Sequence, residues 1–389
     1  MRSKKTLPRP AGVLMSSPAT GRYESVYEVQ EQNATARPAR PLQVCFVPHN
    51  VDNPYQRLLG DALAGENVIV PAAEDVDVLE KDRGSGMLAP GAIIHLHWLP
   101  AQGYRSLPKA LRMLARLVEL RRGGYKLVWT VHNLTPHDTA HPWLNELFSI
   151  AVARVVHALI VHAPSLGNVI ERELLVSAGR IHSIPHGNYI SEYPNVVSVR
   201  RARAAIGVPK GAVCFAFVGY MKPYKGIGEL LRAFSAVKET DARLLLAGPA
   251  ASARYGESIE AAAKADRRVV VDRRYIPREE LQLVMNAASV LVFPFRQVFT
   301  SGSIVLAMSF GKPCIAADGP FTRESLGAQG NFLYDASSPH ALADMLRTVV
   351  RREPEALERI GQRNYALAKQ WSWEYVAHRT RAVYESVVG

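Results

Sequence analysis

Short apolar runs alternate with amphipathic segments along most of the 389-residue chain. In the first half the runs are LQVCFVP (42–48), AIIHLHWLP (92–100), KLVWTVHN (126–133), ALIVHAP (158–164) and IHSIPHG (181–187). Near-continuous apolarity over roughly four to eight residues is typical of strands buried on both faces of a parallel sheet. Because the segments between the runs have helical patterns, this half is predicted to be a doubly wound α/β domain.

The alternation restarts after a polar, Pro-containing stretch at about 190–211. The second set of runs is VCFAFVGYM (213–221), ARLLLAGPA (242–250), RVVVDRRYI (268–276), VLVFPF (290–295) and PCIAAD (313–318). The pattern predicts a second α/β domain of the same kind. In such sheets ligands bind beyond the carboxyl ends of the strands, so the chemistry is expected in the loops that follow the runs.

The predicted organisation has five parts. They are a disordered tail at 1–40, a first domain at 41–190, a linker at 191–211, a second domain at 212–369 and a terminal helix at 370–389. The tail is rich in Pro, Ser, Ala and Arg without periodicity. No run of 18 uncharged apolar residues predicts a membrane-spanning helix, and the N-terminus lacks the apolar core of a secretory signal.

The three cysteines, Cys45, Cys214 and Cys314, each fall inside an apolar run. Scattered in this way, they are predicted to be reduced core residues and not a disulfide framework or a metal site.

The net charge of +12 indicates acidic partners. Nucleic acid is disfavoured, because neither zinc-finger spacing nor an RRM-like aromatic-basic signature is present. Phosphorylated small molecules and anionic membranes remain as the possible acidic partners. The segment 104–126 carries leucines together with a basic side made of Lys109, Arg112, Arg116, Arg121 and Arg122. It is predicted to be a helix that packs on the sheet, that lays its cations on anionic lipid headgroups, or that does both.

The run at 213–221 has a glycine near its end and is followed by two lysines, in the sequence FAFVGYMKPYKGIGELLRAF (215–234). Gly219 permits close backbone approach, and Lys222 and Lys225 lie beside the start of a predicted helix. Cations at a helix N-terminus favour a diphosphate. The order of residues excludes a Walker A loop. The simpler alternative is a pair of solvated lysines on a turn.

A second anion-binding candidate is the stretch FPFRQVFTSGSIVLAMSFGKPCIAAD (293–318). Here Thr300, Ser301, Gly302 and Ser303 precede a predicted helix and offer hydroxyl and N–H donors without any acid. Thr300 or Ser301 could instead act only as the helix N-cap.

In their order along the chain these motifs resemble those of the GT-B glycosyltransferases, which have two doubly wound domains and use nucleotide-diphosphate sugars. The further elements that carry the resemblance are IPHGNY (184–189), LLLAGPA (244–250), YIPREELQLVMNAASVLVFPF (275–295), FGKPCIAAD (310–318) and WSWEYVAHRTRAVYESV (371–387). The resemblance covers nearly all of 41–387. It implies that the donor is contacted by Gly219, Tyr220, Lys222, Lys225, His186, Ile276 and the residues Thr300, Ser301, Gly302 and Ser303.

Two departures from the family pattern limit this inference. The large retaining group carries a Glu-x7-Glu pair, and the matching positions here are Val298 and Leu306. Many members also carry an arginine directly after the strand-end glycine, and here that position is Tyr220. The nearby Lys222 is expected to supply the missing positive charge. The missing acids favour an inverting reaction.

Three segments resemble bacterial exopolysaccharide-type transferases, namely NPYQRLL (53–59), HLHW (95–98) and TVHNLTPHD (130–138). Members of that group include β-mannosyltransferases that extend a polyprenyl-diphosphate-linked oligosaccharide with GDP-mannose. The resemblance therefore implies GDP-mannose as the favoured donor, with a UDP-sugar as the alternative. A lipid-linked oligosaccharide or other polysaccharide precursor is the implied acceptor.

Ten of the twelve histidines lie between His49 and His186. An inverting transfer needs a base for the acceptor hydroxyl, and the candidates after strand ends are His97, His132 and the carboxylate of Asp138. For any single one of these histidines, the simpler interpretation is a hydrogen-bonded structural group. The acceptor is expected to contact Asn50, Asn53, Tyr55 and Gln56 in the loop PHNVDNPYQ (48–56).

Zinc is the competing interpretation of the histidines. His137 with His141 and His182 with His186 have the His-x3-His spacing, which converges two ligands on a helix. Prolines in both segments argue against a helix, so no metal or cofactor is expected.

The sequence thus predicts a cytoplasmic glycosyltransferase associated peripherally with the inner face of the membrane. A nucleotide-sugar epimerase of the same architecture and a non-catalytic GT-B-like binding subunit are the alternatives. An epimerase would use acids at the cleft, which the acid-poor donor loop does not supply.

Overall fold

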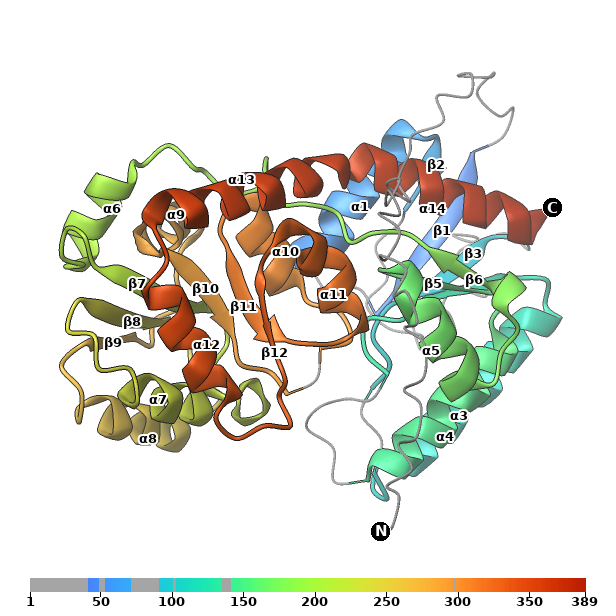
Figure 1. Ribbon diagram of the computed structural model, residues 1–389. Coiled ribbons are helices and arrows are strands. Elements are labelled where there is room, and N and C mark those ends of the chain that lie inside the picture. The colour runs from blue at the N-terminus through green and yellow to red at the C-terminus, as the bar shows by residue number, and fades with distance from the viewer. Residues whose placement is uncertain (1–40, 49–52, 71–90, 101–102, 135–140, 297) are drawn as a thin grey trace, which may run out of the picture. The chain divides into compact units, whose positions relative to one another are not determined.

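The computed structural model describes residues 41–48, 53–70, 91–100, 103–134, 141–296 and 298–389 (Figure 1). A six-stranded sheet occupies the first half, with the order β2-β1-β3-β4-β5-β6 and all pairings parallel. Its strands are β1 (Leu42–Val47), β2 (Val68–Ile69), β3 (Ile93–Leu96), β4 (Lys126–Thr130), β5 (Ala158–Val161) and β6 (Ile181–Ser183). The helices between them are α1 (Pro54–Gly65), α3 (Leu107–Arg122), α4 (Pro142–Val155) and α5 (Pro164–Leu174).

The second half holds another parallel six-stranded sheet, with the order β12-β11-β10-β7-β8-β9. Its strands are β7 (Val213–Val218), β8 (Ala242–Ala247), β9 (Val269–Asp272), β10 (Val290–Phe293), β11 (Cys314–Ala317) and β12 (Phe332–Tyr334). Its helices are α6 (Val199–Ile206), α7 (Ile227–Ser235), α8 (Ala253–Ala263), α9 (Arg278–Ala287), α10 (Gly302–Ser309), α11 (Pro320–Leu326), α12 (Ala341–Val350) and α13 (Pro354–Gln370). The predicted fold class, two doubly wound α/β sheets, is confirmed.

The order of strands places the ligand-binding edge of each sheet. In the second sheet the chain runs outward from β7 to β9 and then returns to the other side of β7 with β10. The loops after β7 and β10 therefore flank the switch point, where doubly wound sheets bind ligands. These are the loops that carry Lys225 and Thr300. In the first sheet the corresponding neighbours are β1 and β3.

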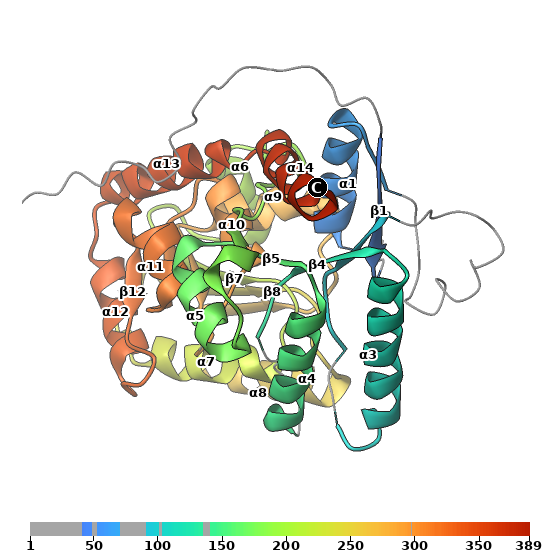
Figure 2. The same ribbon diagram turned by 90° about the vertical axis from the view of Figure 1, so that its right-hand side faces the viewer.

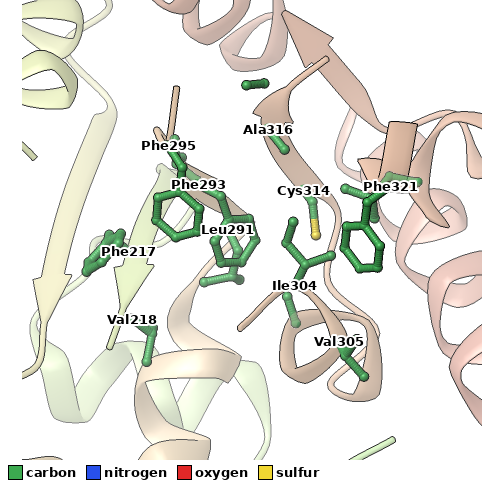
Figure 3. Close-up of a cluster of buried hydrophobic side chains, with 14 of the residues drawn as sticks. Phe217, Val218, Leu291, Phe293, Phe295, Ile304, Val305, Cys314, Ala316 and Phe321 are labelled. Atoms are coloured by element: carbon green, nitrogen blue, oxygen red, sulfur yellow. The ribbon is translucent and has the colours of Figure 1, made fainter. Parts of the chain in front are cut away.

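The helix that follows β10 is apolar nearly all round. Ile304, Val305, Ala307 and Met308 of α10 are fully buried, because the helix lies within the core and packs on α13. Figure 3 draws Ile304 together with Phe217, Phe293 and Phe321 in this cluster. Such packing holds the N-terminal end of α10 in a fixed position.

The C-terminal helix α14 (Trp373–Val388) lies alongside α1 in the first half (Figures 1 and 2). Its Val376, Ala377 and Tyr384 are buried in the same cluster as Val44 and Phe46 of β1. The helix therefore shares its apolar core with the first sheet, although it follows the second sheet in sequence.

Several local predictions are confirmed or corrected. Cys45, Cys214 and Cys314 are buried and free, as predicted. The short strands β2 and β12 escape the sequence pattern, since two or three residues carry little periodicity. The stretch predicted as a linker contains α6, which packs on α9.

The basic segment 104–126 departs from its prediction in two ways. Its helix covers only Leu107–Arg122. Arg116 does not belong to the exposed basic side. Its side chain is only 8% exposed, and its guanidinium forms an ion pair with Glu119 at 3.0 Å. Conversely, Leu107 and Leu111 are exposed, so part of the apolar side does not face the core.

Candidate active site

A cavity of about 230 Å³ lies between the loops of the two sheets. The first half contributes Asn53, Tyr55, Trp98 and His132 to its wall. The remaining wall consists of Asn133 of the first half, of His186 and Tyr189 from the segment between β6 and α6, and of Tyr224, Lys225, Phe295 and the residues Val298 to Ser303 from the second half. Nine of the residues predicted from sequence therefore meet in one place: Asn53, Tyr55, His132, His186, Lys225, Thr300, Ser301, Gly302 and Ser303.

Lys225 is the cation of this cavity. Its Nζ lies 5.8 Å from the ring centroid of Phe217 and 5.6 Å from that of Phe295. Burial, and secondarily the charge of Lys222, lowers the pKa of Lys225 to about 8. The ammonium group is therefore poorly solvated while still mostly charged at neutral pH, and an anionic ligand would stabilise it.

Glycine at position 226 makes this placement possible. Gly226 has a φ of +71°, and a Cβ there would lie 2.2 Å from the carbonyl oxygen of Pro294. A side chain at this position would push the lysine loop away from the end of β10.

The hydroxyls of the Thr-Ser-Gly-Ser loop have separate roles. Ser301 is the N-cap of α10, with its Oγ accepting from the N–H of Ile304 at 3.3 Å. Thr300 donates its hydroxyl proton to the carbonyl of His132 in the first half at 2.8 Å. The alternative interpretation as an N-cap therefore holds for Ser301, and Thr300 joins the two halves. The N–H groups of Gly302 and Ser303 at the start of α10 and the Ser303 hydroxyl remain as donors for an anion.

Gly219, Lys225 and Ser303 converge at the end of β7. A Cβ built on Gly219 would lie 3.8 Å from Lys225 Nζ and 3.9 Å from Ser303 Oγ. The bare backbone of Gly219 therefore leaves room directly beside one cation and one hydroxyl, which is a suitable arrangement for a phosphate group.

His186 faces the start of α10 as a hydrogen-bond acceptor. Its Nδ1 donates to the carbonyl of Gly187 at 2.8 Å, and burial lowers the pKa of His186 to about 4. The ring is therefore neutral at pH 7, with its lone pair on Nε2. A Cβ at Gly302 would lie 3.4 Å from that Nε2. A ligand hydroxyl can donate to this nitrogen, whereas an unprotonated phosphate cannot.

A row of histidines forms the first-half side of the site. His97 Nδ1 lies 3.2 Å from His132 Nε2, and His132 Nδ1 lies 3.4 Å from His162 Nε2. His162 Nδ1 lies 3.0 Å from the carbonyl oxygen of Ile184. The ring of Trp98 stacks on His132 at 4.8 Å. Sequence reasoning did not select His162, because a histidine at the end of an apolar run resembles any buried core residue.

Comparisons with known proteins agree with this geometry. Residues 212–352 match the family of glycosyl transferases group 1. A GDP-mannose:glycolipid 4-beta-D-mannosyltransferase of Xanthomonas campestris pv. campestris is 24% identical over 344 residues, which cover 82% of this chain and 88% of the relative. A D-inositol 3-phosphate glycosyltransferase of Corynebacterium efficiens is 29% identical over 53% of this chain and 50% of the relative.

Solved structures show the same fold. Sucrose-phosphate synthase from Thermosynechococcus elongatus superposes with a TM-score of 0.70 at 17% identity, covering 89% of this chain and 98% of the other. Anabaena HepE in complex with UDP and glucose superposes with a TM-score of 0.68 at 14% identity, covering 89% and 100%. The chain therefore has the GT-B fold, and it is a glycosyltransferase whose residues 212–352 carry the family match.

Some predicted site residues of the transferase lie away from the main cavity. Tyr220 is 52% exposed, and neither it nor Lys222 or Ile276 lines the cavity wall. Gln56 is buried and donates to the carbonyl of Pro48 at 2.8 Å, so its amide is held by the backbone. Tyr55 lines the wall but is only 3% exposed, so it contributes ring surface more than a hydroxyl.

Four of the predicted positions cannot be placed. Asn50, predicted to contact the acceptor, and Asp138, a predicted base, lie outside the described residues, as do His49 and His137. Among the described residues, no group of three or more His, Cys, Asp or Glu side chains is arranged to hold a metal ion.

His95 links the first sheet of the transferase to the C-terminal helix α14. His95 Nε2 lies 2.7 Å from the Thr130 hydroxyl, and His95 Nδ1 lies 2.6 Å from the Tyr384 hydroxyl. Burial lowers the pKa of His95 to about 3. With both nitrogens bonded and no place in the cavity wall, His95 ties α14 to the first sheet.

Among the described residues, the helices are all too short or too polar to cross a membrane.

Proposed function

We propose that this transferase moves a mannosyl residue from GDP-mannose to a lipid-linked oligosaccharide with inversion of the anomeric centre. The observation that carries the proposal is the meeting of Lys225, the α10 N-terminus and neutral His186 in one cavity. The relative from Xanthomonas, whose name states a GDP-mannose donor and a glycolipid acceptor, supports the choice of substrates. The UDP and UDP-glucose complexes of HepE make a UDP-sugar the alternative donor.

The diphosphate of the donor would occupy the corner formed by Gly219, Lys225 and Ser303. The ammonium of Lys225 and the first-turn N–H groups of α10 would stabilise the charge that develops on the leaving diphosphate. In this proposal these groups replace a metal ion.

The sugar of the donor would lie beside His186, with one of its hydroxyls donating to Nε2. Inversion is supported by the cavity wall, where Val298 stands in place of an acid. The acceptor hydroxyl would then attack directly from the first-half side, and a base on that side would take its proton.

Binding of nucleotide-diphosphate sugars tests the donor assignment. At a concentration of about one hundred times Kd, a ligand stabilises a protein by about 2.7 kcal/mol, so the thermal midpoint is expected to rise by several degrees with GDP-mannose. GDP should give a smaller rise, and mannose 1-phosphate little. If only UDP-sugars raise the midpoint, the donor is a UDP-sugar and not GDP-mannose. If no nucleotide sugar raises the midpoint, the proposal is refuted.

A cluster of exposed apolar side chains on α3, on α4 and just before α3, the α3–α4 patch, supports a lipid-linked acceptor at the cytoplasmic face of a membrane. Its members are Tyr104 (62% exposed), Leu107 (38%), Leu111 (58%), Trp143 (50%) and Leu147 (58%). The two helices pack on each other, and the rings of Tyr104 and Trp143 lie 6.4 Å apart.

Charge complements the patch. Arg105, Lys109 and Arg112 are exposed along the same stretch, against Glu119 on α3 and Glu146 on α4. Leucines and aromatic rings beside cations are suited to the headgroup region of an anionic bilayer.

Exchanging Trp143 and Leu147 for serine is expected to release the transferase from vesicles that contain phosphatidylglycerol, measured by co-sedimentation. Burial of the two side chains in the interface is lost, whereas the cations remain. Val270→Ser, which removes an exposed apolar side chain from the second half, is the matched control and should leave binding intact. Equal binding of all three proteins, or equal binding to neutral vesicles, would contradict a membrane role for the patch.

A further inference from the structure

A side cavity of about 80 Å³ adjoins the main cavity, and Trp98 and Asn133 belong to both walls. It lies between the loops that follow β3 and β4 and the buried side of α4, which contributes Phe148 and Ser149. Since one water needs about 10 to 15 Å³ of such space, the side cavity holds roughly five to eight water molecules. This is room for about one sugar ring, and not for a longer chain.

The wall of the side cavity combines aromatic surface with neutral hydrogen-bonding groups. Trp98, Trp129 and Phe148 contribute rings, and Asn133 and Ser149 contribute an amide and a hydroxyl. Ring surface can pack on the C–H groups of a sugar, while the amide and hydroxyl exchange hydrogen bonds with its hydroxyls. The described part of this wall carries no Lys, Arg, Asp or Glu side chain. The side cavity therefore favours a neutral, hydroxyl-rich ligand over an anion.

The hydroxyl of Ser149 is the deepest of these groups. Ser149 is only 4% exposed, and its Oγ forms no hydrogen bond with another described residue. The oxygen is not among the fully enclosed polar atoms, so it is in contact with the open space of the side cavity. Buried polar groups in native proteins normally have a partner. The partner of Ser149 must therefore be a molecule that enters this cavity.

The helix α4 connects the side cavity with the α3–α4 patch. Phe148 and Ser149 lie on its buried side, whereas Trp143 and Leu147 are exposed. Residues four apart share one side of a helix, so Trp143 and Leu147 form a second side of α4, next to the one that lines the cavity. An acceptor whose lipid lies at the patch would have its sugars close to the side cavity.

We propose that the side cavity binds the accepting sugar, a neutral hexose ring, with Ser149 at its inner end and Trp98 and Asn133 at the junction. The inference rests on the proposed function, because it states where the acceptor of that transfer is held. One hydroxyl of the ring faces through the junction into the main cavity, where the donor sugar lies beside His186. The loops after β3 and β4 and the helix α4 thus hold the acceptor, in addition to the contacts predicted for α1.

Removing one hydrogen-bonding group of the side cavity should weaken the acceptor and spare the donor. In Ser149→Ala we expect the KM for acceptors of a membrane lipid extract to rise by about twofold to tenfold, the effect of one neutral hydrogen bond. Asn133→Ala, at an exposed position, should have an effect of the same size. Affinity for GDP-mannose should change by less than about twofold, because neither residue belongs to the corner formed by Gly219, Lys225 and Ser303.

Ser165→Ala is the matched control. Ser165 belongs to α5 of the same half, its hydroxyl also lacks a partner among the described residues, and it lines neither cavity. This variant should match the wild type in acceptor KM. Equal KM values in the Ser149, Asn133 and Ser165 variants would overturn the proposal.

Binding of free sugars tests the same site without any transfer reaction. The probes are the methyl glycosides of glucose, mannose, galactose and N-acetylglucosamine, added with GDP, and saturation-transfer NMR detects the sugars that contact the protein. At least one glycoside should bind the wild type and Ser165→Ala. Ser149→Met, whose longer side chain fills the cavity, should lose that signal, and Asn133→Ala should weaken it even if the methionine variant does not fold.

The outcomes separate this proposal from the proposed function. A glycoside signal that is unchanged in Ser149→Met and Asn133→Ala would overturn the sugar site, as would the absence of binding by every glycoside. Binding that depends on Ser149, in a wild type that transfers no sugar, would count against the proposed function and support the site. Transfer by the wild type with an unchanged acceptor KM in both variants would have the opposite meaning.

Discussion

Replacing Lys225 by methionine should lower the rate of sugar transfer by about 10² to 10³-fold, the effect of removing one group that stabilises charge in a transition state. Methionine keeps the apolar stem over Phe217 and Phe295 and removes the ammonium. Affinity for GDP-mannose should also fall, because a hydrogen bond to a charged group contributes about 1.5 to 3 kcal/mol. Steady-state kinetics and titration calorimetry measure the two effects.

The pH dependence of binding gives a second signature of the same lysine. Because the pKa of Lys225 lies at about 8 in the free protein, the side chain loses its charge as the pH rises through 8. Nucleotide affinity of the wild type should therefore fall above pH 8, whereas the methionine variant should show no decline there.

Lys238→Met is the matched control, since Lys238 is an exposed lysine of the same half with a bond to a backbone carbonyl. It should match the wild type in kinetics, in affinity and in pH dependence. Equal transfer rates in the Lys225 and Lys238 variants would show that Lys225 does not bind the diphosphate.

Mild acid should unfold the transferase, and this is the second large effect. Burial lowers the pKa values of His95 and His162 to about 3 and of His186 to about 4, and holds that of His132 well below its usual range. Below a pH of about 6.5 the unfolded chain protonates these four histidines while the folded protein does not. Stability is therefore complete above pH 6.5 and is lost as the pH falls toward the folded pKa values.

The size of the loss is substantial. At pH 5 each of the three histidines with a folded pKa of about 3 to 4, His95, His162 and His186, lowers the free energy of unfolding by about 2 kcal/mol, and the three together by about 6 kcal/mol. His132 shifts in the same direction and adds to this loss. The total free energy of unfolding of a typical protein is only about 5 to 15 kcal/mol. Urea unfolding at a series of pH values measures the slope, which gives the number of protons taken up.

His162→Gln provides the comparison for this slope, because it removes one of the four protons and nothing else that titrates. Its free energy of unfolding should depend less steeply on pH between 6.5 and 5 than that of the wild type. A wild-type stability that stays constant over this range would contradict the neutrality of the buried row.

The sequence predicted the two sheets because each strand except β2 and β12 has its own signal in a short apolar run. It predicted the lysine and hydroxyl loops because ligands bind at the ends of such strands. The position of Lys225 also depends on local chemistry, the left-handed Gly226 beside Pro294. All of this is encoded within a few residues along the chain.

The contacts that decide the roles of these residues are not local. Thr300 donates to a carbonyl 168 positions away, and His95 meets Tyr384 across 289 positions. His162 lies beside the carbonyl of Ile184, and this contact follows from the pairing of β5 with β6. No spacing in the sequence predicts such a contact, which is why His162 was not selected from the sequence.

Transfer of radiolabelled mannose from GDP-mannose to a membrane lipid extract tests the central claim most directly. The account predicts label in the organic-soluble, lipid-linked fraction, dependent on Lys225 and obtained with EDTA present. Binding of GDP-mannose without any transfer to lipid or saccharide acceptors would instead indicate a non-catalytic binding subunit. Release of an altered free nucleotide sugar would indicate an epimerase. Either result would contradict the function proposed for this GT-B protein.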